Sequence, residues 1–212
     1  MMTDQSNVNS HDLRADLQEI ANLIPAGSKI LEIGCADGDL LHWLVHHKNC
    51  EARGMELGQE GVNNCIAKGL YVVQGDADTD LQDYPDQSFD YVILSRTLQA
   101  VHRPRDVVQQ LLRIGKKAIV SIPNFGHWKI RWQLLTKGRM PVTRHLDYSW
   151  YDTPNIHFCT IRDLVNMVEA DGFKIAAFTP LNAQGRKIST TLSRANWSAH
   201  QALFTLQKGE TE

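Results

Sequence analysis

The chain has no long hydrophobic stretch. None of its apolar runs approaches the roughly 18 consecutive residues that a transmembrane helix needs, so no membrane span is predicted. The first 12 residues are polar and acidic and lack the basic and apolar regions of an export signal, so we expect a cytoplasmic protein. With 42% hydrophobic residues and a net charge of −2, the 212 residues are not those of a disordered chain.

Paired cysteines are missing as well. Cys35, Cys50, Cys65 and Cys159 form no C-x-x-C pair and have no zinc-binding spacing. Isolated cysteines in a chain without an export signal are typical of reduced thiols packed as small core residues. We therefore expect neither a disulfide framework nor a metal site.

Acidic residues are absent from one segment of the chain. Residues 107–146 contain eight lysines and arginines and no aspartate or glutamate, which gives them a charge of +8. Residues 1–106 carry −9 and residues 147–212 carry −1. The small net charge therefore hides a strong separation of charge along the chain.

Short apolar runs alternate with helix-like stretches over the first 122 residues. The runs span 29–33, 52–57, 70–74, 89–94 and 117–122, with helical patterns at 40–47, 60–67 and 107–114 between them. An amphipathic pattern over 10–24, with Ser10 as its cap, predicts one further helix. Strands that are apolar on both faces and joined by helices are typical of a parallel sheet covered on both sides. The sequence thus predicts a doubly wound α/β fold.

The pattern changes after residue 122. A helix is predicted over 125–137, where Phe125, Trp128, Trp132 and Leu135 share one side, and we expect Trp132 to face the core. Gly138 fits the end of that helix.

The end of the chain returns to regular structure. Thr160 and Asp163 form a capping box that opens a helix ending at Gly172, and closing strands are predicted at 173–178 and 202–207. We interpret residues 1–212 as a single domain, with an N-terminal helical segment over 1–27 and a basic and aromatic insertion over 123–159.

The strongest chemical signal is the segment from Lys29 to Gly38, in which a buried strand runs into a glycine-containing turn that opens a helix. In an α/β sheet this is where ligands bind. Gly34 and Gly38 allow close approach of the backbone, and Glu56, at the end of the second run, stands where a carboxylate can accept both hydroxyls of an adenosine ribose. Asp76 ends the third run, where it could bind an adenine amino group.

Other nucleotide fingerprints fail. G-x-G-x-x-G would need glycine at Ala36 and Asp39, and no Walker lysine is present. Glu32, two residues before Gly34, suits a ligand with a positive amino-acid head group better than a pyrophosphate. S-adenosylmethionine is such a ligand.

Residues 28–178 resemble the class I S-adenosylmethionine-dependent methyltransferases. The resemblance implies a Rossmann-like, mostly parallel seven-stranded sheet with an antiparallel last strand, and it implies that S-adenosylmethionine or S-adenosylhomocysteine is bound. The residues that it assigns to the ligand are Glu32, Gly34, Cys35, Ala36, Gly38, Glu56, Leu57, Asp76, Ala77 and Ser95. Ala36 departs from the family pattern, which has glycine there, and Ser95 falls where the family faces its methyl-transfer cleft.

Longer motifs give a closer resemblance. The segments 89–101 (FDYVILSRTLQAV), 121–128 (SIPNFGHW), 138–143 (GRMPVT) and 150–157 (WYDTPNIH) are similar to the MetW family over about residues 28–175. What this implies is a methionine-biosynthesis protein that supports the homoserine O-acyltransferase MetX.

The residues themselves show little catalytic machinery. No G-x-S-x-G elbow is present, so a Ser nucleophile for acyl transfer is not expected in this chain. The candidate general bases are isolated polar residues that are more typical of loops or partial cores: His102, His127, His145, His157, Asp37 and Asp152. We therefore favour an accessory subunit that binds S-adenosylmethionine or S-adenosylhomocysteine. A self-sufficient methyltransferase acting on a small molecule is the alternative, since methyl transfer needs mainly alignment of its reactants.

The basic segment also carries aromatic residues of the kinds enriched at protein interfaces. Its cations are Arg113, Lys116, Lys117, Lys129, Arg131, Lys137, Arg139 and Arg144, and Tyr148, Trp150 and Tyr151 follow. We expect MetX to bind through residues 123–157. Nucleic acid would fit a basic and aromatic surface too, but the pI of about 6.5 and the lack of an appended RNA-binding module argue against it. A membrane-surface role is weaker still.

Overall fold

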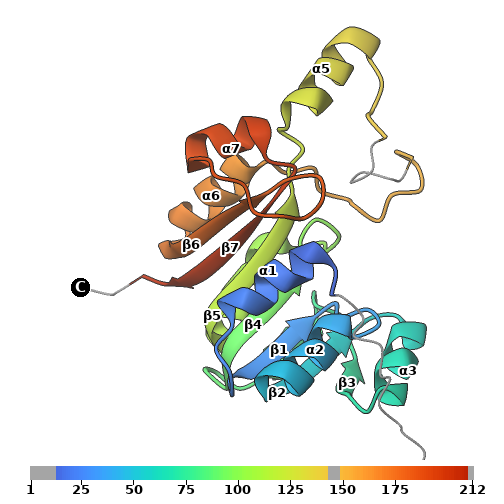
Figure 1. The fold of residues 1–212 in the computed structure, drawn as a ribbon, viewed down its shortest axis with the longest axis vertical. Coiled ribbons are helices and arrows are strands. Elements are labelled where there is room, and N and C mark those ends of the chain that lie inside the picture. Colours follow the sequence, from blue (N-terminus) through green and yellow to red (C-terminus); the bar gives the residue numbers. More distant parts are fainter. Residues whose placement is uncertain (1–12, 143–148, 210–212) are drawn as a thin grey trace, which may run out of the picture.

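The computed structural model of the chain describes residues 13–142 and 149–209. Seven strands form one sheet in the order β3-β2-β1-β4-β5-β7-β6 (Figure 1). The strands are β1 (Lys29–Ile33), β2 (Glu51–Glu56), β3 (Tyr71–Gln74), β4 (Phe89–Ser95), β5 (Gly115–Pro123), β6 (Phe173–Leu181) and β7 (Gln201–Lys208). Only β7 runs antiparallel to its neighbours, β5 and β6. The predicted doubly wound sheet with an antiparallel last strand is confirmed.

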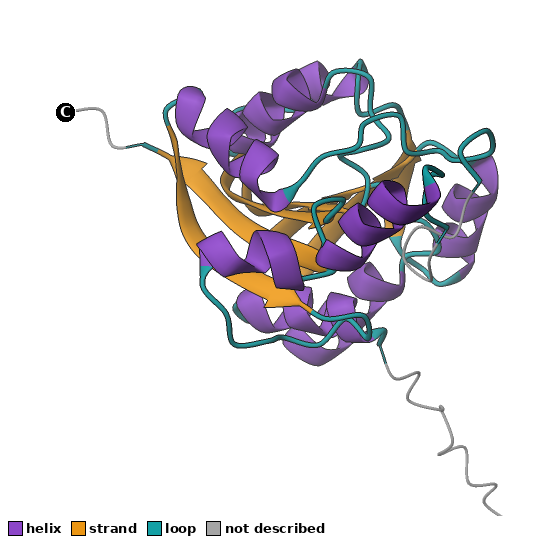
Figure 2. Cartoon of the chain, turned by 90° about the horizontal axis from the view of Figure 1, so that it is seen from above, coloured by secondary structure: helices purple, strands orange, loops and turns teal. Residues whose placement is uncertain are grey.

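Helices cover both faces of this sheet (Figure 2). They are α1 (Ala15–Leu23), α2 (Asp39–Lys48), α3 (Gln59–Ala67), the short 3₁₀ helix η1 (Asp80–Asp83), α4 (Pro104–Ile114), α5 (Trp128–Lys137), α6 (Ile161–Ala170) and α7 (Leu192–Ser198). None of the helices in the described ranges is long and apolar enough to span a bilayer.

Successive side chains of the central strands enter two separate cores. Ile30 of β1 and Ile93 of β4 pack with α1 and α2, whereas Leu31 and Val92, their neighbours in the chain, pack with α4 and α6. Because side chains alternate across a strand, burial on both faces requires the unbroken apolar runs seen in the sequence. Glu32 interrupts this pattern, and it is buried nevertheless.

Local signals set most of the boundaries. The capping box at the start of α6 forms as predicted: Thr160 Oγ1 accepts from Asp163 N, and Asp163 Oδ2 accepts from Thr160 N at 2.9 Å. Gly138, with φ of 57°, ends α5. The N-terminal helix begins later than predicted, at Ala15, with Arg14 at its N-cap, and the predicted cap Ser10 lies outside the described residues. Helix α7 was not predicted.

The prediction that Trp132 of α5 faces the core is wrong. Trp132 is 62% exposed, Leu135 is 79% exposed and Trp128 is also exposed, while only Ile130 on this helix is buried. The helix projects from the end of β5 away from the sheet, at the top of Figure 1. The side of the helix that carries the tryptophans therefore has no core to pack against. Phe125 precedes the helix and packs edge-to-face on Phe158, with ring centroids 4.8 Å apart.

Candidate functional site

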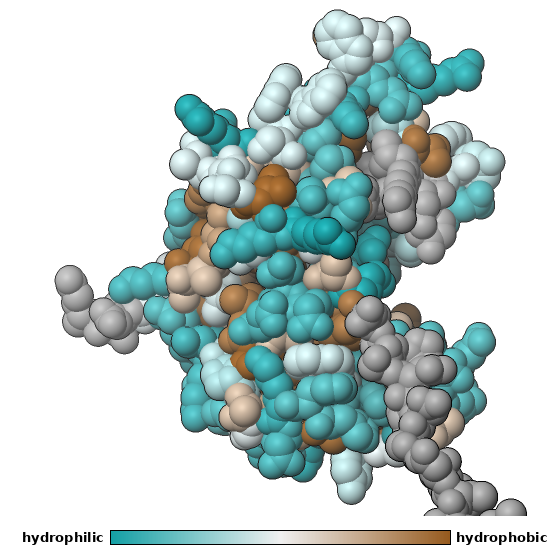
Figure 3. Space-filling view, viewed as in Figure 1, coloured by the Kyte–Doolittle hydropathy of each residue, from teal (hydrophilic) through white to brown (hydrophobic). Residues whose placement is uncertain are grey.

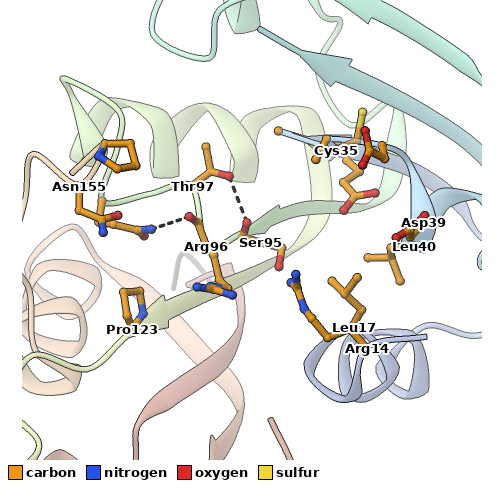
Figure 4. Close-up of a pocket in the computed structure, with 16 residues that line it drawn as sticks. Arg14, Leu17, Cys35, Asp39, Leu40, Ser95, Arg96, Thr97, Pro123 and Asn155 are labelled. Carbon is orange, nitrogen blue, oxygen red and sulfur yellow. Dashed lines mark hydrogen bonds between the residues drawn. The ribbon is translucent and has the colours of Figure 1, made fainter. Parts of the chain in front are cut away.

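A cavity of about 390 Å³ lies at the edge of the sheet where β1 and β4 end. Such a volume falls in the range of small-molecule sites. One wall is the loop after β1, and a second is the loop after β4, residues 95–99 (Figure 4). Helix α1 adds Arg14 and Leu17, and residues 123 and 154–155 come from the two ends of the insertion.

The loop after β1 is held in a conformation that favours glycine. Gly34 and Gly38 have φ of 69° and 74°, and a Cβ at Gly34 would lie 2.6 Å from Thr97 Oγ1. Ala36, where the methyltransferase pattern has glycine, also has a positive φ, of 47°. The left-handed region costs a residue with a Cβ about 1 kcal/mol or more, so the physical reason for glycine at this point of the loop is evident.

Glu32 brings a buried carboxyl group to this cavity. Its side chain is 3% exposed, and its Oε2 has no hydrogen-bond partner among the residues that the structure describes. Desolvation raises the pKa of Glu32 to about 8, and the negative charge of Asp39 adds to the rise. A carboxyl group that has lost water and gained no donor is a costly arrangement in a folded protein. A positively charged ligand group would remove that cost.

Glu56 is tied to the same loop. Its Oε2 accepts from Ala36 N at 2.8 Å, and its Oε1 accepts from Gly58 N at 2.9 Å. A carboxylate offers about four acceptor positions, so two hydrogen bonds leave two for hydroxyl groups of a ligand. Leu57 beside it is 64% exposed, an unusual position for leucine next to a polar loop.

Asp76 follows β3 and organises the turn beyond it. Its Oδ1 accepts from Asp78 N at 2.9 Å, while its own N donates to Asp80 Oδ2 at 2.8 Å. Asp76 is half-buried, and Ala77 packs against the core. The ends of β1, β2, β3 and β4 thus place all ten predicted ligand residues along one edge of the sheet, but only Glu32, Gly34, Cys35, Ala36 and Ser95 line the cavity itself.

Several polar residues in the cavity were not predicted as ligand residues, among them Arg14, Arg96 and Gln99. Arg14 reaches in from the start of α1, and Arg96 reaches in from the end of β4 (Figure 4). Gln99 is buried, and its Oε1 has no partner within the described ranges. The position of Arg96, directly after a buried strand that ends at this edge, was the one signal in the sequence that could have identified it.

The candidate general bases do not come together. His127 is buried at the N-cap of α5, where its Nδ1 accepts from Lys129 N, and His102 and His157 are exposed. Asp37 accepts a hydrogen bond from Asn64, Asp152 is exposed, and His145 lies outside the described residues. None of these residues lines the cavity except Asp37. No nucleophile, base and orienting group assemble among the residues that the structure describes.

The insertion presents an exposed basic and aromatic surface. Trp150 is 73% exposed and Tyr151 is 69% exposed, and the rings meet edge-on at 5.6 Å. Lys137 and Arg139 at the end of α5 are exposed too. The surface over the projecting helix is teal to near white in Figure 3, so it is hydrophilic to intermediate in hydropathy. Arg144 and Tyr148 lie outside the described residues.

Comparison with known families identifies the family of this chain. The family model described as "Methionine biosynthesis protein MetW" matches residues 14–206. The chain belongs to the MetW family. A bifunctional methionine biosynthesis protein MetXA/MetW from Rhodopirellula baltica is 36% identical over 165 residues, 74% of this chain and 26% of that protein. The chain thus spans about a quarter of the length of this curated relative.

Solved structures agree with the fold of this MetW family member. An S-adenosylmethionine-dependent methyltransferase from Mesorhizobium loti has a TM-score of 0.65 at 19% identity, covering 93% of this chain and 99% of that one. A SAM-dependent methyltransferase from Archaeoglobus fulgidus has a TM-score of 0.67 at 16% identity, covering 92% of each chain. The likeness establishes a class I methyltransferase-like fold.

Proposed function

We propose that this chain binds S-adenosylmethionine or S-adenosylhomocysteine at the edge of its sheet, and that it supports MetX, a homoserine O-acyltransferase, as an accessory subunit in methionine biosynthesis. Two parts of the molecule support the two halves of this proposal. The cavity beside Glu32 supports the ligand, and the projecting insertion supports the partner.

The observation that carries the ligand assignment is the unpartnered oxygen of Glu32. Both ligands have an amino-acid head group with an ammonium, which supplies the hydrogen-bond donors and the positive charge that this buried carboxyl group lacks. Binding of a cation would favour the ionised form of Glu32. The tight contact of Gly34 with Thr97 brings the loop backbone close to the same place.

The remaining predicted residues suit the nucleoside end. Glu56 has acceptor capacity left for the two ribose hydroxyls, and Asp76, at the end of the next strand, could accept from the adenine amino group. Leu57 offers an exposed apolar side chain next to Glu56 against which a base could pack.

Calorimetric titration with S-adenosylhomocysteine tests this assignment. Glu56→Ala removes two acceptor positions and Glu32→Gln removes the charge, so each should weaken binding roughly tenfold or more. Glu60→Gln, a neutralised exposed carboxylate in the first turn of α3, is the matched control and should bind as the wild type does. Equal affinities for wild type and Glu56→Ala would remove the ribose assignment.

The partner assignment rests on charge and exposure. Within the described residues, Lys129, Lys137 and Arg139 form no ion pair with a carboxylate, and they lie in the same insertion as the exposed Trp132 and Trp150. Aromatic residues and arginine are enriched at the centre of protein interfaces, and polar and charged residues form the rim. The relative from Rhodopirellula baltica carries the names of both proteins in one chain, which agrees with such an association.

Reconstitution with MetX tests this half. Purified MetX should gain homoserine acylation when the chain is added, and the two should co-elute. Replacing both Trp150 and Tyr151 by alanine should weaken the association. Tyr71→Ala, which removes an aromatic ring that is 80% exposed on β3, should not. Unchanged turnover without co-elution would refute the accessory role.

A self-sufficient methyltransferase is the second candidate, and one observation favours it. The cavity lined by Glu32 and Ser95 is also lined by Arg96 and Asn155, polar side chains that a second reactant could contact. Methyl transfer from labelled S-adenosylmethionine to small molecules in a cell extract would distinguish the candidates, since an accessory subunit alone should label nothing.

A further inference from the structure

The far wall of the cavity contains a cation with no counter-charge. Arg96 lies directly after β4, lines the cavity, and forms no ion pair with any residue in the described ranges. Arg14, which approaches the same space from α1 (Figure 4), differs: its Nε and Nη2 bind the two oxygens of the buried Asp16 at 2.6 and 3.0 Å. Arg14 is thus neutralised, and Arg96 is not.

The backbone of Arg96 is fixed in an unfavourable conformation. Its φ is 56°, in the left-handed region that favours glycine. Three hydrogen bonds hold it there: Arg96 N donates to Ser121 Oγ at 2.9 Å and to Ser121 O at 3.2 Å, and Gln99 Nε2 donates to Arg96 O. The left-handed backbone of Arg96 therefore lowers the stability of the folded state, as is common for residues at binding sites. The side chain of Arg96 lines the cavity.

Gln99 supplies the opposite kind of group next to Arg96. It is 5% exposed, lines the cavity, and uses its amide nitrogen on Arg96 O, which leaves Oε1 without a donor among the described residues. Its main-chain oxygen accepts from Ile156 N at 2.9 Å and His157 N at 3.0 Å, so the end of the insertion closes over it. A buried acceptor without a donor is uncommon in native proteins.

The carboxylates that line the cavity do not bind the guanidinium of Arg96 or the amide of Gln99. Asp37 accepts from Asn64, Asp39 pairs with Lys68 at 2.8 Å, and Glu32 forms no ion pair with Arg96. A guanidinium presents a fork of donors that matches a carboxylate, and an unpaired amide oxygen needs an N–H or O–H donor. One ligand that carried both groups would satisfy Arg96 and Gln99 together.

We propose that Arg96 and Gln99 form a second small-molecule subsite, next to that of the nucleoside ligand, which takes a carboxylic acid bearing a hydroxyl or amino group. The carboxylate binds the Arg96 guanidinium, and the hydroxyl or amino group donates to Gln99 Oε1. This inference relies on the proposed function only for the identity of the neighbouring ligand, because the two groups lack partners whatever binds at Glu32.

Saturation-transfer NMR with three probes tests the subsite. L-lactate carries both groups, L-lactamide lacks the charge and propionate lacks the donor. The wild type should bind L-lactate about tenfold more tightly than either of the others. Equal binding of lactate and lactamide, or no saturable binding of lactate, would overturn the anion site, and equal binding of lactate and propionate would overturn the role of Gln99.

Two variants separate binding from folding. Arg96→Gln keeps a long side chain and should lose about tenfold in lactate affinity. Arg96→Gly removes the cation and also relieves the left-handed strain, so it should lose lactate while unfolding at a higher temperature than the wild type. Arg139→Gln, an exposed cation outside the cavity, should bind lactate normally. Normal lactate binding by Arg96→Gln would refute the proposal.

Titration of the same variants with S-adenosylhomocysteine distinguishes this proposal from the one above. Arg96→Gln should bind it within about twofold of the wild type, because we assign the ammonium of its head group to Glu32 and assign Arg96 to the second ligand. A loss as large as that for lactate would show that Arg96 belongs to the nucleoside site and would overturn the second subsite. Lactate binding by a wild type that does not bind S-adenosylhomocysteine would support the subsite and refute the proposed ligand.

Discussion

Glu32→Gln should make the protein more stable at alkaline pH and leave it unchanged at mildly acidic pH. Burial raises the pKa of Glu32 from 4.5 to about 8. Below about pH 4.5 the carboxyl group is protonated in both the folded and the unfolded chain and costs nothing. Between the two values the unfolded chain releases the proton and the folded chain retains it, so stability falls as pH rises.

The magnitude follows from the two pKa values. At about 1.4 kcal/mol per pH unit, the interval from 4.5 to about 8 corresponds to roughly 4 to 5 kcal/mol lost by the wild type once the pH exceeds 8. Glutamine is nearly the same shape as a protonated glutamate and does not titrate. Its variant therefore escapes this loss, a large effect for a domain whose total stability is on the order of 10 kcal/mol.

Urea unfolding of wild type and Glu32→Gln across about pH 5 to 9 measures the effect. The two stability curves should be close near pH 5 and diverge steadily above it, with the variant higher. Saturating S-adenosylhomocysteine should raise the wild-type curve more than that of the variant, because its ammonium compensates the carboxylate. Parallel curves without ligand would refute the conclusion that Glu32 is buried without a compensating donor or cation.

Three further substitutions test the architecture around the site by urea unfolding. Ala36→Gly should stabilise the chain by up to about 1 kcal/mol, since φ at this position is 47°, and a loss of stability would contradict the left-handed conformation. Gly34→Ala should cost about 2 to 3 kcal/mol through its 2.6 Å contact with Thr97, and Thr97→Ala should recover part of this in the double variant; additive effects would exclude the contact. Asn124→Ala should cost about 2 to 4 kcal/mol, because its amide joins the end of β5 to carbonyls of α7, whereas exposed Asn63→Ala should change little.

The sequence by itself determined the sheet and much of the proposed ligand edge. The five apolar runs became β1 to β5. In the central strands β1 and β4 the runs are largely apolar because these strands are buried on both faces, whereas β3 is an exposed edge strand. The capping box of Thr160 and Asp163 predicted the start of α6. The glycines of the loop after β1 indicated a backbone with positive φ. Residues that end parallel strands must meet at one edge, so the sequence alone groups Glu32, Glu56 and Asp76.

Only the tertiary structure decided what surrounds those residues. Periodicity placed Trp128 and Trp132 on one side of a helix, but it could not show that α5 leaves the sheet, because a helical face is buried only where another element meets it. The uncompensated charge of Arg96 and the unpartnered oxygens of Glu32 and Gln99 depend on which groups the fold brings around them and on how far it buries them. Charge compensation and desolvation are properties of the folded surroundings, so no local pattern encodes them.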